Sequence, residues 1–141
     1  MPLQNRVMPD ARIVAYPGRG LLMGNRGCLH DAGGAIVRPW RGMRWISCLT
    51  EFRGRRRALL QPGRYTELFF LDEAVALATG HRPCAECRRA DHLRFRAAWG
   101  RAGLPGGGSV DGIDRVLHEA RTTPGRPVLP VADLPAGAFL A

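Results

Sequence analysis

Short apolar runs separated by glycine-containing turns fill the segment from residue 21 to residue 71. The turns recur about every ten residues, and the runs between them carry aromatic and β-branched side chains, which favour strands. We therefore expect an antiparallel β-meander whose strands lie within residues 21–30, 35–40, 43–52, 55–60 and 64–71.

The pattern becomes helical after residue 71. Asp72 is a good N-cap for the alanine-rich run at residues 73–79, and Gly80 suits the position after a helix end. A second helix is predicted from residue 83 or 84 to about residue 101, because its apolar side chains recur at i, i+4 spacing. A glycine-rich segment then precedes a short helix predicted at residues 113–121.

The length of 141 residues fits one compact unit, and the contents of 45% hydrophobic and 23% charged residues are ordinary for a globular protein. No apolar run approaches the ~18 residues that a membrane helix needs. The first residues lack the apolar core of a signal peptide, so we expect a cytoplasmic protein without a membrane partner.

The charge is strongly basic: 21 basic against 12 acidic residues give a net charge of +9, and every basic residue is arginine. Such a surface attracts polyanions, and the arginine fork suits phosphate groups. The predicted nucleic-acid contacts are Arg53, Arg55, Arg56 and Arg57 at a predicted hairpin tip, together with Arg88 and Arg89. The alternative is a solvated loop that protects an edge strand.

Four cysteines carry the most specific chemistry in the sequence. Cys84 and Cys87 form a Cys-x-x-Cys pair at a predicted loop-to-helix junction, where both thiolates can face one tetrahedral ion. Cys28 and Cys48 raise the count to four, and His30 could replace Cys28. These residues predict one closed structural zinc site.

Two other interpretations of the cysteines remain open. A redox pair would follow a strand in a βαβ unit, whereas this pair follows a predicted helix. Burial without a metal-binding role would account for Cys28 or Cys48 individually, but it accounts less well for the Cys-x-x-Cys pair.

Residues 68–89, LFFLDEAVALATGHRPCAECRR, resemble the second half of the Ada-type zinc domain, a DNA methylphosphotriester-repair module. The resemblance implies a small sheet packed on helices, a zinc site that includes Cys84 and Cys87, and contact with a DNA backbone. The first half departs from that family, because Cys28 and Cys48 lie twenty residues apart instead of forming Cys-x-x-x-Cys. One cysteine of that motif is the family's methyl acceptor, so methyl transfer is not carried over.

Together these features predict an α+β fold, with a small antiparallel β-meander packed on two or three helices and stabilised by zinc. The chain is predicted to begin with an irregular arm (residues 1–20), followed by a zinc-binding domain (residues 21–102). A glycine-rich linker (residues 103–112) then leads to a short helix with a C-terminal extension (residues 113–141).

We expect a zinc-binding protein that binds nucleic acid, DNA more than RNA, and we favour binding over catalysis. One alternative is an enzyme acting on DNA or RNA, by self-methylating repair or by nuclease chemistry. A nuclease needs carboxylates that hold a metal, and the available ones are Asp31, Glu51, Glu67 and Asp72. The other alternative is a zinc-stabilised adaptor whose basic face binds an acidic protein.

Overall fold

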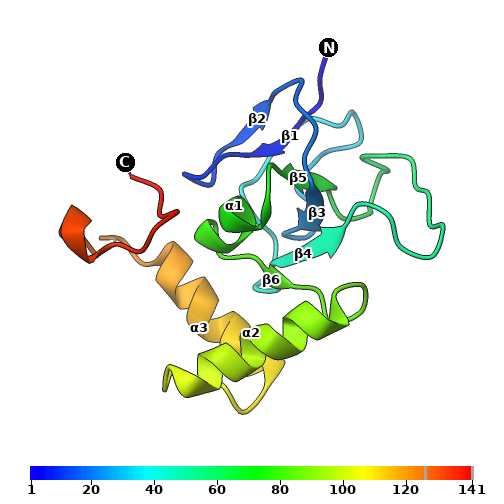
Figure 1. The fold of residues 1–141 in the computed structure, drawn as a ribbon. Helices are drawn as coiled ribbons and strands as arrows, with labels where there is room; N and C mark the ends of the chain where they lie inside the picture. Colours follow the sequence, from blue (N-terminus) through cyan, green and yellow to red (C-terminus); the bar gives the residue numbers. More distant parts are fainter. Residues whose placement is uncertain (126, 141) are drawn as a thin grey trace.

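A six-stranded mixed sheet forms the centre of the structure, a computed structural model that describes residues 1–125 and 127–140 (Figure 1). Arg126 and Ala141, which fall in the predicted C-terminal extension, lie outside these residues. The strand order is β2-β1-β5-β3-β4-β6. The strands are β1 (Gln4–Val7), β2 (Ile13–Ala15), β3 (Leu22–Asn25), β4 (Ile46–Leu49), β5 (Leu68–Phe70) and β6 (Arg82–Pro83).

The fold mixes sheet and helices as predicted, but the sheet is not an antiparallel meander. Strand β1 runs parallel to β5, and β4 runs parallel to β6. Residues 1–20, predicted as an irregular arm, supply β1 and β2, while residues 55–60 form no strand. Residues 35–40 contribute only an isolated bridge between Ile36 and His30. Sequence-local turn signals do not specify such long-range pairings.

One face of the sheet carries the hydrophobic core. Side chains from β1 and β5 pack there against helix α1 (Glu73–Ala78), which lies against the sheet in Figure 1. The helix start is confirmed, because the Asp72 carboxylate accepts a 2.9 Å hydrogen bond from the Val75 amide. Gly80 follows the helix with φ = 82°, a conformation that favours glycine. The core residues are Val7, Leu29, Leu68, Phe70, Val75 and Ala76.

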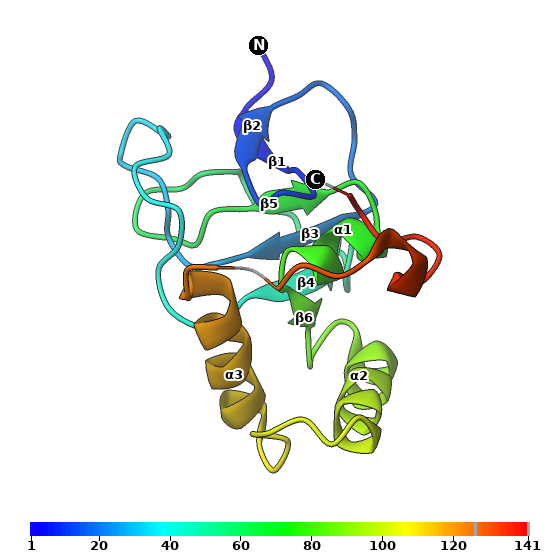
Figure 2. The ribbon, with the colours of Figure 1, turned by 90° about the vertical axis from the view of Figure 1, so that its left-hand side faces the viewer.

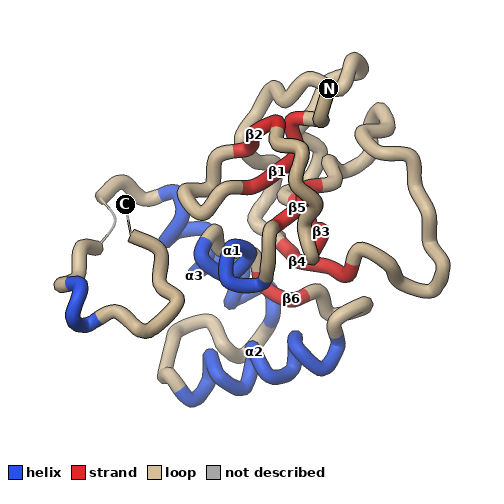
Figure 3. Tube along the Cα trace, turned by 45° about the horizontal axis from the view of Figure 1, so that its top comes forward, coloured by secondary structure: helices blue, strands red, loops and turns tan. Residues whose placement is uncertain are grey.

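The opposite face of the sheet is bordered by a long loop. Met23 pairs with both Cys48 and Phe69, so these three side chains share a face that alternates with the core face. The chain from residue 50 to residue 67 connects β4 to β5 without regular structure, and Figures 1 and 3 show it projecting from the sheet. This segment holds the arginine cluster of residues 53–57, which therefore lies in an irregular loop and not at a hairpin tip.

Two longer helices lie at the β6 end of the sheet (Figure 2). Helix α2 (Arg89–Arg101) begins five or six residues later than the predicted start at residue 84 or 83, because residues 85–88 form turns. Helix α3 (Val110–Thr122) begins earlier than predicted, since the Ser109 hydroxyl accepts a hydrogen bond from the Gly112 amide. A short 3-10 helix (Val131–Asp133) follows in the C-terminal segment.

Buried charges join α3 to the sheet. The Arg82 guanidinium donates to both carboxylate oxygens of Asp114, over 2.6 and 2.9 Å, and both side chains are about 95% buried. Arg121 donates to the Gly80 and Met43 carbonyls and lies 3.9 Å from the Trp45 ring centroid. Helix α3 is therefore anchored on the sheet, although a glycine-rich segment precedes it.

Candidate metal centre

Three cysteines converge at one edge of the sheet. The sulfur atoms of Cys48, Cys84 and Cys87 all lie within 4.8 Å of one another. Cys48 is buried, whereas Cys84 and Cys87 are half-buried. Three soft sulfur donors at this separation could hold a metal ion, because about 3.8 Å between sulfurs is expected around a tetrahedral ion with 2.3 Å bonds.

The parallel pairing of β4 with β6 brings these cysteines together. Ser47 pairs with Pro83, and the next residues along the chain, Cys48 in β4 and Cys84 just after β6, therefore lie side by side. The Cys84 amide donates to the Ser47 carbonyl over 2.9 Å, and the Leu49 amide donates to the Cys87 sulfur over 3.4 Å. These bonds fix the turn that carries Cys84 and Cys87 against the end of β4.

The structure does not bring Cys28 or His30 to this cluster. The Cys28 thiol donates to the His30 carbonyl over 3.7 Å. Both ring nitrogens of His30 are already used, one with the Thr66 hydroxyl at 2.6 Å and the other with the Gln61 carbonyl at 3.1 Å. Over residues 1–125 and 127–140, the cluster therefore contains three of the four predicted cysteines, and the predicted closed four-ligand site is not formed.

The three sulfur atoms do not ionise independently. The hydrogen bond with Cys48 lowers the pKa of the Cys84 thiol to about 5. The same hydrogen bond, reinforced by burial, raises the pKa of Cys48, and burial raises the pKa of Cys87. The raised pKa values of Cys48 and Cys87 favour the thiol form of these two side chains, and a bound cation would favour the thiolate form of all three.

Metal affinity is therefore expected to rise with pH. Binding must displace the protons of Cys48 and Cys87, so the logarithm of the apparent affinity should increase by about two per pH unit between about pH 6 and 8. Competition against a chelator of known affinity, corrected for the chelator's own protonation, measures this slope. A flat profile would contradict a site built from these thiols.

The cysteine cluster lines a cavity of about 560 Å³ on the free face of the sheet, which is the face opposite the hydrophobic core. Its floor includes Met23 and Phe69, and the loop between β4 and β5 supplies Phe52 and Tyr65. A volume of this size lies in the range of small-molecule sites. Three cysteine ligands would leave a fourth position on a tetrahedral ion for water or another donor, and all three cysteines border this cavity.

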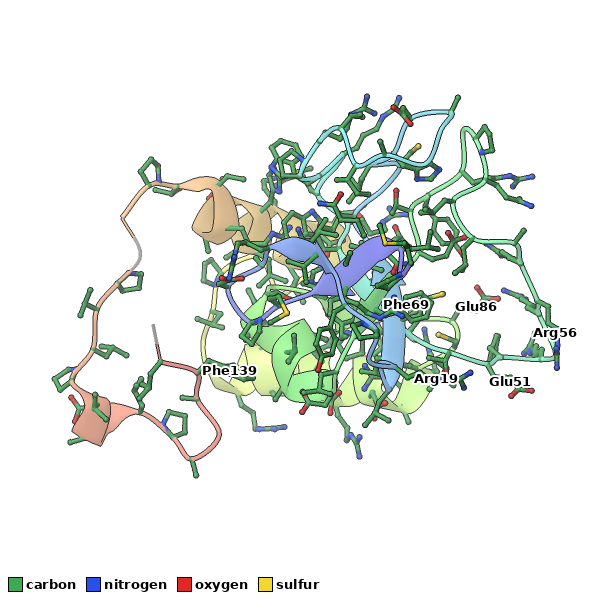
Figure 4. All side chains as sticks on the ribbon, turned by 90° about the horizontal axis from the view of Figure 1, so that it is seen from above. Arg19, Glu51, Arg56, Phe69, Glu86 and Phe139 are labelled. Carbon is green, nitrogen blue, oxygen red and sulfur yellow. The ribbon has the colours of Figure 1, made fainter. Side chains whose placement is uncertain are left out.

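The arginine-rich loop (residues 53–57) forms another side of the same cavity. Arg55 donates to the Glu86 carboxylate over 2.6 Å, which ties the loop to the turn between Cys84 and Cys87. The Arg57 guanidinium lies over the Tyr65 ring. Arg56 is exposed, and Figure 4 places it with Glu51 at the outer edge of the molecule. Arginines of this loop therefore stand next to the candidate metal site.

Arg88 and Arg89 differ in their surroundings. The Arg88 side chain is 95% buried; it donates to the Ser47 hydroxyl over 2.9 Å and pairs with Glu73 and Asp91. Arg88 therefore joins β4, α1 and α2 and cannot reach a nucleic acid, because its donors are occupied inside the fold. Arg89 is exposed at the start of α2.

Phe52 and Phe69 line the cavity but were not among the predicted site residues. The spacing of Tyr65, Glu67 and Phe69 is the sequence feature that could have identified this side of the cavity. Side chains two residues apart in an extended segment point to the same side.

No protein-family model, no curated protein and no solved structure matches this chain. Among the residues that the structure describes, no helix combines the length and the apolar character needed to cross a membrane.

Proposed function

We propose that the protein binds one zinc ion through Cys48, Cys84 and Cys87 and binds nucleic acid through the adjacent arginine-rich loop. Thiolates favour zinc, and the three sulfur atoms lie close enough to share one ion. The zinc ion would hold β4 against the turn that precedes α2 and so stabilise this edge of the sheet.

The link between the loop and the cysteine turn is the observation that carries the proposal. The ion pair between Arg55 and Glu86 connects a segment with four arginines to the residues between two metal ligands. A metal that orders the turn would therefore also help to order Arg55, at the centre of the loop. Exposed arginines beside an ordered site are suited to phosphate contacts, and the net charge of +9 favours a polyanionic partner.

The nucleic acid is proposed to be DNA in preference to RNA, which rests on the resemblance of residues 68–89 to the Ada-type zinc domain. Arg89 extends the proposed surface at the start of α2, next to the cysteine turn.

Replacing Arg53, Arg55, Arg56 and Arg57 with glutamine is expected to weaken DNA binding and to flatten its salt dependence. Each phosphate contact that is lost should reduce the slope of log K against log salt by roughly one unit. The fold should be retained, because exposed loop substitutions usually cost under about 0.5 kcal/mol each. Fluorescence anisotropy with a labelled oligonucleotide at several salt concentrations measures both effects.

A charge-matched control replaces four exposed arginines elsewhere, namely Arg12, Arg41, Arg101 and Arg115. This variant removes the same charge but should leave most of the salt slope unchanged. Equal losses in both variants would indicate a diffuse charge effect and would contradict a specific role for the loop.

A further inference from the structure

The cavity on the free face of the sheet combines three chemical features that no metal site needs. It has aromatic walls, a buried carboxylate and arginines at its rim, in addition to the cysteines. A cavity with apolar walls and a few fixed polar groups is typical of a site for an organic ligand.

The aromatic wall comes from the loop and from the sheet. Phe52 and Tyr65 belong to the segment between β4 and β5, and Phe69 lies on β5. The guanidinium groups of Arg55 and Arg57 lie 5.4 and 5.2 Å from the centroids of the Phe52 and Tyr65 rings. Arginines and aromatic rings in this arrangement are suited to stacking on a planar ring that carries a negative substituent.

Glu67 supplies the polar group inside the cavity. Its side chain lines the cavity although the residue is only 2% exposed. One carboxylate oxygen accepts a 2.9 Å hydrogen bond from the Leu60 amide. Over the described ranges, no basic side-chain nitrogen lies within 4 Å of this carboxylate. A buried carboxylate without a cation retains acceptor capacity for N–H donors of a ligand.

Asn25 adds an amide beside this carboxylate. Gly24 pairs with Leu68 between β3 and β5, so the antiparallel register continues to Asn25 opposite Glu67, and both side chains line the cavity. A carboxylate next to an amide can recognise the hydrogen-bonding edge of a nucleobase. Guanine fits best, because its N1–H and N2–H groups can donate to the two oxygens of one carboxylate.

We propose that this cavity receives a single unpaired guanine nucleotide, with the base stacked among Phe52, Tyr65 and Phe69 and its edge on Glu67. The 5′-phosphate would contact Arg56 at the rim. This inference deepens the proposed nucleic-acid binding and rests on it: the protein would recognise an exposed base in single-stranded or locally unpaired DNA, rather than the groove of a duplex.

The test is calorimetric titration of the full chain with dGMP and with dTMP. We expect one dGMP per chain, bound at least about tenfold more tightly than dTMP, because thymine offers a single N–H donor. The Glu67→Gln variant keeps the side-chain size but replaces one acceptor by a donor. It should weaken dGMP binding by roughly tenfold or more and abolish the preference, whereas Glu119→Gln on the exposed face of α3 should change neither.

Two further variants separate the contacts. Phe69→Leu should weaken the binding of both nucleotides, since every base has a face that can stack on an aromatic ring. Arg56→Gln should weaken dGMP but not deoxyguanosine, which has no phosphate. Thermal unfolding of each variant shows whether a loss of binding reflects a loss of the fold.

The outcomes distinguish this inference from the proposed function. Absence of dGMP binding at millimolar concentration, or binding that Glu67→Gln leaves unchanged in a folded protein, overturns the guanine site. If oligonucleotide binding still depends on the arginine-rich loop, the proposed function stands while the guanine site fails. If guanine-selective binding requires Glu67 but oligonucleotide binding does not depend on the loop arginines, recognition of the base by Glu67 stands, whereas the phosphate contacts of the loop, including that of Arg56, fail.

Discussion

The Cys84→Ser variant is expected to lose the proposed zinc ion and to be largely unfolded at 37 °C. Cys84 contributes one of three sulfur atoms that lie within 4.8 Å of one another, and the two remaining thiolates would hold the proposed ion far more weakly. Structural zinc supplies on the order of 10 kcal/mol in small zinc domains, which is comparable to the whole free energy of unfolding of a typical domain. Circular dichroism melts of the variant and of chelator-treated wild-type protein should therefore show the same loss of stability.

Cys28→Ser is the matched control for this variant. The Cys28 thiol lies outside the cluster and donates to the His30 carbonyl. Its replacement should keep the metal and cost about 1 kcal/mol or less. Equal effects of the two substitutions, or a Cys84→Ser protein that melts like wild type, would show that the cysteines do not hold a stabilising ion.

Asp114→Ala is expected to lower the free energy of unfolding by about 3–5 kcal/mol. The substitution leaves the Arg82 guanidinium buried and without its carboxylate, and an uncompensated buried charge is strongly destabilising. Asp111→Ala is the control, because Asp111 is exposed and its 3.5 Å pair with Arg44 should contribute under about 1 kcal/mol. Urea unfolding measures both variants.

A double replacement sharpens this prediction. Arg82→Met combined with Asp114→Leu removes both charges, so it should recover much of the stability that Asp114→Ala loses. If Asp114→Ala is no worse than Asp111→Ala, α3 is not held on the sheet through this ion pair.

Helix α1 could be predicted almost to the residue because its determinants are local. The Asp72 side chain caps the first turn, the alanine-rich run favours helix, and Gly80 adopts the positive φ that ends it. None of these features depends on a distant part of the chain.

The sheet could not be predicted in the same way, because its order depends on distant pairings. Strand β5 lies between β1 and β3, and β6 joins the edge as a two-residue strand parallel to β4. Turn signals indicate where the chain reverses, but they do not indicate which strands become neighbours. Within the irregular loop of residues 50–67, residues 55–60 are predicted as a strand because glycine-containing turns flank them on both sides.

The difference between local signals and distant pairings also explains which residues of the candidate site could be predicted. Cys84 and Cys87 are predicted from their spacing and Cys48 from the count of four cysteines, and the parallel pairing of β4 with β6 is what brings Cys48 to the other two. Cys28 follows Gly27, whose φ of 96° turns the chain after β3, and it lies outside the cluster. Charge alone did not distinguish Arg88, buried among carboxylates, from the exposed Arg89.

Metal analysis of the full chain, purified without chelators, tests the central claim most directly. Elemental analysis by mass spectrometry should find about one zinc per wild-type chain and per Cys28→Ser chain. Each of Cys48→Ser, Cys84→Ser and Cys87→Ser should retain almost none. A wild-type protein without metal, or a zinc content that depends on Cys28 and not on Cys48, would contradict the three-cysteine site.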